Sequence, residues 1–229
     1  MRIVLLPGLH GTDDLFAEFV AAAPADAVID MVSYPTEEPM SYADHVEFAW
    51  QRLPATGPYV VLGESFSGPV SVLLADSRPI GLCGIILVNT FITSPAWSGL
   101  QRLPWERLMA RRLTKLTAAH YLTGRRHASH FLEPIREASL RSSPQVKAAR
   151  LRAVLSVDVR EAFKRLGVPV LYLRGSKDRL VRKRSLATVK AVRPGTEVVL
   201  LPGPHLVLQV LPHESWRAIR RFAESACSG

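Results

Sequence analysis

The chain has 229 residues, of which 48% are hydrophobic and 21% are charged, and its formal net charge is +9. This length suffices for one full domain that folds without disulfides or metals, and the composition is ordinary for a soluble globular protein. No apolar run approaches the roughly 20 residues that a membrane-spanning helix needs, and the apolar stretch before Pro7 is too short for a signal peptide. Two cysteines, Cys83 and Cys227, predict no disulfide framework, so a cytoplasmic location is expected.

Short apolar runs alternate with amphipathic segments along most of the chain. The apolar runs, bounded by turn residues, predict strands at 2–6, 28–33, 59–62, 84–88, 168–173 and 197–201. Apolar residues at helical spacing predict helices at 13–23, 42–53, 68–75, 159–166, 185–192 and 215–225. Because strands that alternate with helices form parallel β–α–β units, we expect an α/β fold with a mostly parallel sheet of about six strands and helices on both faces.

The alternation of strands and helices stops between residues 94 and 157, where helix-like segments occur without a strand pattern. A stretch of roughly 60 residues exceeds any ordinary connection. We therefore predict an inserted helical cap at 94–157 and a core formed by 1–93 and 158–229. The positive charge is concentrated here, with 15 Lys or Arg against 5 Asp or Glu between Gly99 and Arg165. Such asymmetry either attracts an acidic partner or marks a solvated helical face.

The sharpest pattern is the sequence Gly-Glu-Ser-Phe-Ser-Gly at 63–68, which follows a predicted strand and opens a predicted helix. A serine on a sharp turn between a strand and a helix is held in strained geometry, with its hydroxyl above the sheet, in the pattern Gly-x-Ser-x-Gly. Here Ser67 occupies the second glycine position and Gly68 comes just after. If Ser67 were the nucleophile, Pro69 would occupy a glycine position, so Ser65 is the predicted nucleophile. The alternative without chemistry is a serine-rich helix cap.

Two other predicted strands end close to groups that can activate a serine. Asp178 follows the strand at 168–173, and His205 follows the strand at 197–201. A serine needs an adjacent base, and the carboxyl ends of parallel strands meet at one edge of a sheet. We therefore expect the imidazole of His205 to act as the base for Ser65 and the carboxylate of Asp178 to orient that imidazole.

Four segments together resemble the motifs of the α/β-hydrolase superfamily. They are the turn at 63–68, the sequence Gly175-x-x-Asp178-x-x-Val181, the sequence Gly203-Pro204-His205 and the opening loop Leu6-Pro7-Gly8-Leu9-His10-Gly11-Thr12. The resemblance covers residues 1–93 and 158–229. It implies the chain order Ser, acid, His and a hydrolase of esters, thioesters or related acyl bonds that needs no metal or organic cofactor.

The same resemblance implies an oxyanion hole. A tetrahedral intermediate needs two preorganised backbone donors, and losing one costs roughly 3 kcal/mol. One donor is expected to be the N–H of Phe66, which follows the nucleophile, and the other should come from the loop after the first strand. The amide of Leu9 is the candidate there, and the amide of His10 is the alternative because the register of this loop is uncertain by one residue.

Other histidines and carboxylates fit these roles less well. His45 belongs to a predicted helix. His127 and His130 are closely spaced, but no cysteine or carboxylate pattern completes a metal site. Asp158 is the rival orienting acid, yet it precedes a predicted helix, where capping is its ordinary role. Glu64, beside the nucleophile, is expected to have a structural or modulating role.

The cap is expected to set the specificity for the substrate. Apolar residues that could line an acyl tunnel, although their helical spacing also suits packing in a core, are Trp97, Leu103, Trp105 and Met109. Arginines that could dock an acidic acyl carrier protein are Arg102, Arg107, Arg111, Arg112, Arg125 and Arg126. In size and layout the chain is similar to small hydrolases that cleave a methyl ester from a carrier-bound pimeloyl chain, and this similarity implies a carrier-linked substrate as one alternative.

The predicted function is therefore hydrolysis of carboxylic esters or thioesters of small or medium acyl chains. Nucleic acid is not an expected partner, because the basic segment lacks aromatic-interleaved basic strands, a helix-turn-helix pattern or zinc spacing. An alternative of another class is a ligand receptor that keeps the fold without catalysis. The complete set of Ser65, Asp178 and His205 argues against a receptor.

Overall fold

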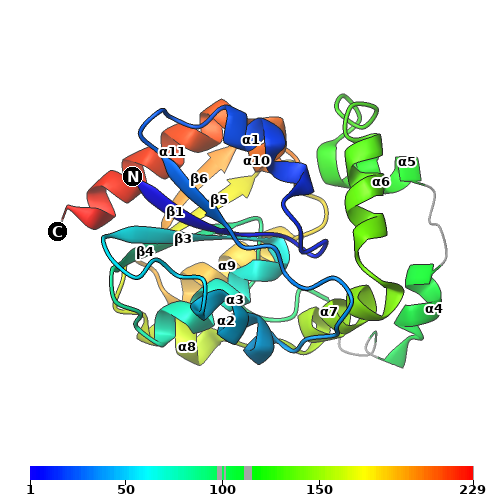
Figure 1. Cartoon of the computed structure of the whole chain (residues 1–229), viewed down its shortest axis with the longest axis horizontal. Helices are drawn as coiled ribbons and strands as arrows, with labels where there is room; N and C mark the ends of the chain where they lie inside the picture. Colours follow the sequence, from blue (N-terminus) through cyan, green and yellow to red (C-terminus); the bar gives the residue numbers. More distant parts are fainter. Residues whose placement is uncertain (97–99, 101, 111–114, 229) are drawn as a thin grey trace.

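The computed structural model describes residues 1–96, 100, 102–110 and 115–228. Six strands form one sheet in the order β2-β1-β3-β4-β5-β6, and all five pairings are parallel. The strands are β1 (Arg2–Leu6), β2 (Val28–Met31), β3 (Tyr59–Glu64), β4 (Leu82–Val88), β5 (Val170–Gly175) and β6 (Glu197–Leu201). The predicted parallel sheet is thus confirmed, and Figure 1 shows helices on both of its faces.

The central strands β1, β3, β4 and β5 consist mostly of buried apolar residues, because helices cover both faces of the sheet. In β1, Val4 and Leu6 point into one apolar cluster, whereas Ile3 and Leu5 point into another on the opposite face. Alternate side chains of a strand point to opposite faces, so an unbroken apolar run supplies both layers of the core.

Helices from both halves of the chain cover the two faces. One face is covered by α2 (Tyr42–Trp50), α3 (Gly68–Asp76), α8 (Arg160–Arg165) and α9 (Lys183–Val192). The other face is covered by α1 (Ala17–Ala21), α10 (Val207–Val210) and α11 (Pro212–Cys227). The N-terminus of α2 is fixed by a capping box, in which Ser41 and Asp44 each bond the backbone of the other.

Some elements differ from the sequence-based expectation in their bounds. The predicted helix at 13–23 is a short 3₁₀ turn, η1 (Asp14–Phe16), followed by α1. The predicted strand at 168–173 begins two residues later, because Pro169 lacks the N–H that a central strand must donate. Four residues just after His205 form α10, which the sequence did not predict.

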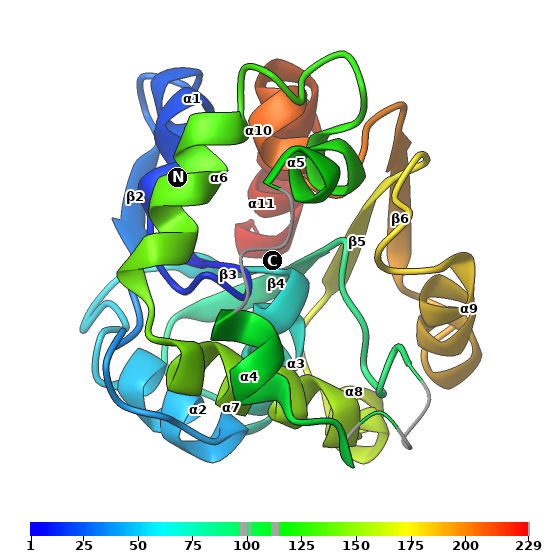
Figure 2. The same ribbon diagram turned by 90° about the vertical axis from the view of Figure 1, so that its right-hand side faces the viewer.

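The described part of 94–157 contains four helices and no strand. They are α4 (Trp105–Ala110), α5 (Lys115–Thr123), α6 (Leu132–Arg141) and α7 (Pro144–Ser156). Thr93 and Asp158 form an isolated antiparallel bridge, so this segment leaves and re-enters the sheet region at neighbouring points. Figure 2 shows α4, α5 and α6 in front of the carboxyl edge of the sheet. Among the described residues, none of the helices has both the length and the apolar character needed to cross a bilayer.

Candidate active site

Ser65 lies on the turn between β3 and α3, where the backbone geometry is strained. Its φ of 49° falls in the left-handed region, which costs a non-glycine residue free energy and is characteristic of functional sites. Gly63 makes the turn possible, because a Cβ at this position would lie 2.2 Å from Ser71 Oγ and 2.5 Å from the carbonyl oxygen of Ser67. The turn thus presents Ser65 at the carboxyl edge of the sheet, as the sequence predicts.

Ser67 occupies the second glycine position of the Gly-x-Ser-x-Gly pattern, and the structure explains why a serine fits there. The close approach occurs at Gly68, where a Cβ would lie 2.0 Å from Thr90 Oγ1, and Thr90 Oγ1 donates a hydrogen bond to the carbonyl oxygen of Ser65. Ser67 has room for its hydroxyl, which is fully buried and donates to the carbonyl oxygen of Pro7 in the loop after β1. Ser67 therefore joins the turn at Ser65 to the opening loop.

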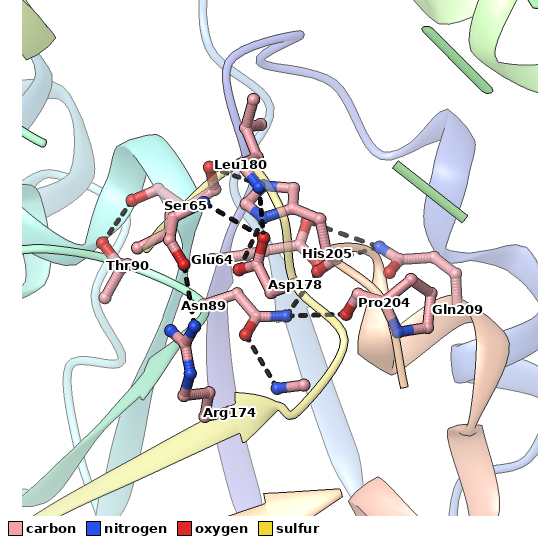
Figure 3. A network of polar contacts seen from close by, with 12 residues as sticks. Glu64, Ser65, Asn89, Thr90, Arg174, Asp178, Leu180, Pro204, His205 and Gln209 are labelled. Atoms are coloured by element: carbon pink, nitrogen blue, oxygen red, sulfur yellow. Dashed lines mark hydrogen bonds and ion pairs between the residues drawn. The ribbon is translucent and has the colours of Figure 1, made fainter. Parts of the chain in front are cut away.

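The three side chains expected to meet do so (Figure 3). His205 Nε2 lies 3.0 Å from Ser65 Oγ, and His205 Nδ1 lies 3.0 Å from Asp178 Oδ2. Asp178 Oδ1 accepts from the backbone N–H groups of Leu180 at 2.8 Å and Val181 at 3.0 Å, which leaves Oδ2 for the imidazole. An Nδ1–H held by the carboxylate leaves the lone pair of Nε2 facing the serine hydroxyl. Both partners of the serine are buried.

Asn89 is a residue of this site that sequence reasoning missed. Its Nδ2 donates to the carbonyl oxygens of Pro204 at 3.1 Å and His205 at 2.5 Å, and its Oδ1 accepts from the N–H of Gly175 at 2.8 Å. Asn89 thereby connects the loop that carries His205 to the end of β5. Its φ of 43° is a conformation that asparagine adopts more readily than most residues. An Asn directly after the apolar run of β4 was the only signal in the sequence.

Glu64 lies directly before Ser65 and is fully buried. Both of its carboxylate oxygens accept from Gln209 Nε2, at 3.1 and 3.3 Å. Burial raises the pKa of Glu64 to about 7, against the opposing effects of nearby His205 and of the hydrogen bond from Gln209. The site therefore contains a second, poorly solvated carboxyl group behind the imidazole.

In the loop after β1, every carbonyl from Pro7 to Gly11 accepts a hydrogen bond, and all of these bonds except the one to Gly8 come from outside the loop. The bonds are Ser67 Oγ to Pro7, Gly11 N to Gly8, Arg150 Nη1 to Leu9 and to His10, Ser142 Oγ to His10, and Tyr34 N to Gly11. Among the described residues, neither the N–H of Leu9 nor that of His10 donates a hydrogen bond. Both sequence-predicted candidates for this donor are thus free to bind a ligand. Phe66 follows Ser65, and its ring stacks on the ring of Tyr42 with the two ring centroids 4.9 Å apart.

The residues proposed for the cap occupy several kinds of position. Leu103 is 39% exposed, and the half-buried Trp105 donates its indole N–H to the carbonyl oxygen of Leu100 at 2.8 Å. Trp97 and the side chain of Met109 lie outside the described residues, as do Arg111 and Arg112. The described arginines are all exposed, namely Arg102, Arg107, Arg125 and Arg126. Their roles in substrate binding and docking remain predictions.

The rival groups lie elsewhere or are engaged in other contacts. His45 is buried in α2, where its Nδ1 lies 2.6 Å from the carbonyl oxygen of Ser41. Asp158 pairs with Arg160 at 2.6 Å and is half exposed. Among the described residues, no group of three or more His, Cys, Asp or Glu side chains is arranged to hold a metal ion.

Comparison with known proteins identifies the family. A family model described as the alpha/beta hydrolase family matches residues 3–224, nearly the whole length of the chain. The chain therefore belongs to the alpha/beta hydrolase family.

Individual relatives are more distant. Monoglyceride lipase from Mus musculus is 28% identical over 131 residues, which are 54% of this chain and 42% of the lipase. The chain therefore matches less than half the length of this relative. An esterase from Thermogutta terrifontis has a TM-score of 0.81 at 20% identity, over 99% of this chain and 90% of that one. A carboxylesterase from Nitrososphaera gargenis has a TM-score of 0.79 at 18% identity, over 98% and 90% of the two chains. At these identities the structural likeness establishes the fold.

Proposed function

We propose that this chain is a serine hydrolase that cleaves carboxylic esters or thioesters of small or medium acyl chains through an acyl-enzyme on Ser65. The observation that carries the proposal is the position of the His205 imidazole, which lies 3.0 Å from the hydroxyl of Ser65 on one side and 3.0 Å from the carboxylate of Asp178 on the other. A base within hydrogen-bond reach of a serine, itself oriented by a third group, is the arrangement that activates the serine.

The reaction proceeds in two half-steps. Ser65 Oγ attacks the acyl carbonyl carbon while His205 Nε2 takes its proton, and Asp178 stabilises the imidazolium that forms. The N–H groups of Leu9 and Phe66 bind the oxyanion of the tetrahedral intermediate. His205 then protonates the leaving alcohol or thiol as the acyl bond to it breaks. In the second half, His205 takes a proton from a water molecule as that water attacks the acyl carbonyl carbon. His205 then returns the proton to Ser65 Oγ as the bond between Ser65 and the acyl group breaks, which releases the acid and regenerates the serine hydroxyl.

A carrier-linked acyl ester or thioester is a second candidate substrate class. The supporting observation is that Arg102, Arg107, Arg125 and Arg126 are exposed and form no ion pair with any carboxylate in the described part of the chain. These arginines would attract an acidic carrier protein, so the partner would contact α4 and the turn after α5.

Replacing the nucleophile tests the proposal. We expect Ser65→Ala to lower kcat on p-nitrophenyl esters at least about a thousandfold and to abolish labelling by a fluorophosphonate. Ser77→Ala is the matched control, because this exposed hydroxyl bonds only its own helix, at the carbonyl oxygen of Leu73. Ser67→Ala should still be labelled, since Ser67 Oγ is buried on Pro7. Full activity of Ser65→Ala would overturn the proposal.

A further inference from the structure

Arg150 carries a guanidinium group inside the protein without a carboxylate partner. The residue lies on α7 and is only 1% exposed. No Asp or Glu of the described chain forms an ion pair with it. Burial lowers the pKa of Arg150 to about 10, so the group remains charged at neutral pH. A buried charge is costly unless many hydrogen bonds compensate for its lost hydration.

The partners of this guanidinium are backbone carbonyls of two loops. Arg150 Nη1 donates to the carbonyl oxygens of Leu9 at 3.0 Å and His10 at 2.8 Å, and Nη2 donates to the carbonyl oxygen of Pro35 at 2.8 Å. Ser142 Oγ also donates to the carbonyl oxygen of His10, at 2.9 Å. Two successive carbonyls of the loop after β1 are thus held by one charged group.

Gly11 provides the space for this contact. Its φ is +82°, and a Cβ on it would lie 2.1 Å from Arg150 Nη1. The glycine therefore allows the guanidinium to lie against the backbone of the loop. Arg150 therefore packs against this loop, although 139 positions separate it from Gly11 in the chain.

Fixing these carbonyls also fixes the N–H groups of the loop. A peptide unit is planar, so the direction of the carbonyl of Leu9 determines the direction of the N–H of His10, and the carbonyl of Gly8 does the same for the N–H of Leu9. The carbonyl of Gly8 accepts from the N–H of Gly11 at 3.0 Å, within the turn that Arg150 covers. The two free donors of the loop thereby acquire a defined direction.

We propose that Arg150 is a positioning residue for the oxyanion hole, which holds the Leu9–His10 backbone so that its N–H groups meet the developing oxyanion. The inference rests on the proposed function, because it assumes that a tetrahedral intermediate forms at Ser65. Arg150 does not touch the substrate. It acts through the loop, and the transition state loses binding when the loop shifts.

The test is Arg150→Lys, which keeps the charge and loses the planar fork that reaches both loops. We expect kcat per fluorophosphonate-titrated site to fall roughly tenfold to a hundredfold while KM changes less than about threefold, because misplaced oxyanion donors weaken the transition state more than the ground state. Binding of an arylboronic acid, which mimics the tetrahedral intermediate, should weaken in parallel with kcat.

Arg193→Lys is the matched control. Arg193 likewise donates to two backbone carbonyls, those of Leu166 at 2.6 Å and Val168 at 2.8 Å, but at the amino end of β5, away from Ser65. Its replacement should lower the melting temperature and leave kcat per titrated site unchanged. If Arg150→Lys does not fold, Ser142→Ala decides, since it removes one donor to His10 and should lower kcat severalfold at constant KM.

The outcomes separate the two proposals. Wild-type kcat in Arg150→Lys, or in a folded Ser142→Ala that replaces it, overturns the inference alone. An equal loss of kcat in Arg193→Lys also overturns it, because the effect would then reflect general destabilisation. A wild-type protein that neither hydrolyses p-nitrophenyl acetate nor takes up the fluorophosphonate overturns the proposed function and the inference with it.

Discussion

At the scale of single residues, the protonation of Glu64, which lies beside Ser65, affects the stability of the fold. Its carboxyl group is buried, and that burial raises its pKa to about 7 from an ordinary value near 4.5. An acid whose pKa is raised by folding binds protons more tightly in the native state than in the unfolded state. The stability that this group contributes is therefore fully present below about pH 4.5 and is lost as the pH rises through 7.

Glu64→Gln should remove this pH dependence, because a neutral amide replaces the carboxyl group. Relative to the wild type, we expect the free energy of unfolding of the variant to rise between pH 5 and pH 8 by up to roughly 3 kcal/mol. Urea unfolding at the two pH values measures the difference. Glu161→Gln, at an exposed position on α8, is the control and should show no such rise. Equal pH dependence in Glu64→Gln and the wild type would contradict the prediction.

The sequence pattern predicts the residues of the site that have a characteristic chemistry, and it misses the residues that support them. Ser65, Asp178 and His205 were predicted because a serine on a glycine turn and two polar groups after strands form a recognisable set. Asn89 and Arg150 were not, because their role is to bond backbone carbonyls far away in the chain. No local pattern reports such a contact, which exists only after the chain has folded.

At the scale of elements, the packing of α3 against the segment just after β4 depends on Gly68. Gly68→Ala places a methyl group where Thr90 Oγ1 and Cγ2 would lie 2.0 and 2.5 Å away. Because Thr90 also bonds the carbonyl oxygen of Ser65, either the helix or the turn at Ser65 must move. We expect a loss of about 1–3 kcal/mol of stability and a lower kcat, measured by urea unfolding and by ester hydrolysis.

Gly167→Ala is the control for this substitution. A Cβ on Gly167 meets no atom within 4 Å, and its φ lies outside the left-handed region. We expect wild-type kcat and equal or slightly higher stability, since alanine restricts the unfolded chain. Equal behaviour of the two alanine variants would show that the contact between Gly68 and Thr90 does not constrain the turn.

The same scale shows which elements could be predicted. The strands were found because each contains a short apolar run that ends near a turn residue, and in the central strands that run is buried on both faces. The short helix α10 was missed because its four residues give no periodicity. The contacts of the 94–157 segment with the loops of the site were also beyond prediction. Besides Arg150, the carbonyl oxygen of Leu122 accepts from the N–H of Leu206, next to His205, at 2.8 Å.

At the scale of the whole molecule, the positive charge is unevenly distributed, and only some of the basic residues form ion pairs with carboxylates. Several basic residues between 99 and 165 form ion pairs, such as Arg152 with Glu106 at 3.1 Å and Arg165 with Asp76 at 2.6 Å. The four exposed arginines that support a carrier-linked substrate have no such partner in the described chain. They lie on α4, just before it and on the turn after α5, and both helices stand in front of the carboxyl edge of the sheet (Figure 2).

This arrangement predicts a salt effect that depends on the substrate. If an acidic carrier docks on these arginines, raising NaCl from about 0.05 to 0.3 M should lower kcat/KM on a carrier-linked acyl thioester roughly tenfold, because exposed charges more than a Debye length apart are screened. A free thioester with the same acyl chain should be hydrolysed equally well at both salt concentrations.

Charge-reversed variants locate the effect on the surface. The double variant Arg125→Glu and Arg126→Glu should lower kcat/KM on the carrier-linked substrate alone, whereas Arg217→Glu on α11, also an exposed position but on the body of the fold, should leave both substrates unaffected. The comparison distinguishes docking from total charge, since Arg217→Glu also makes the molecule less positive. Hydrolysis of the carrier-linked substrate that is indifferent to salt and to the double variant would exclude docking on this surface, and it would leave the proposed hydrolysis of free esters at Ser65 unaffected.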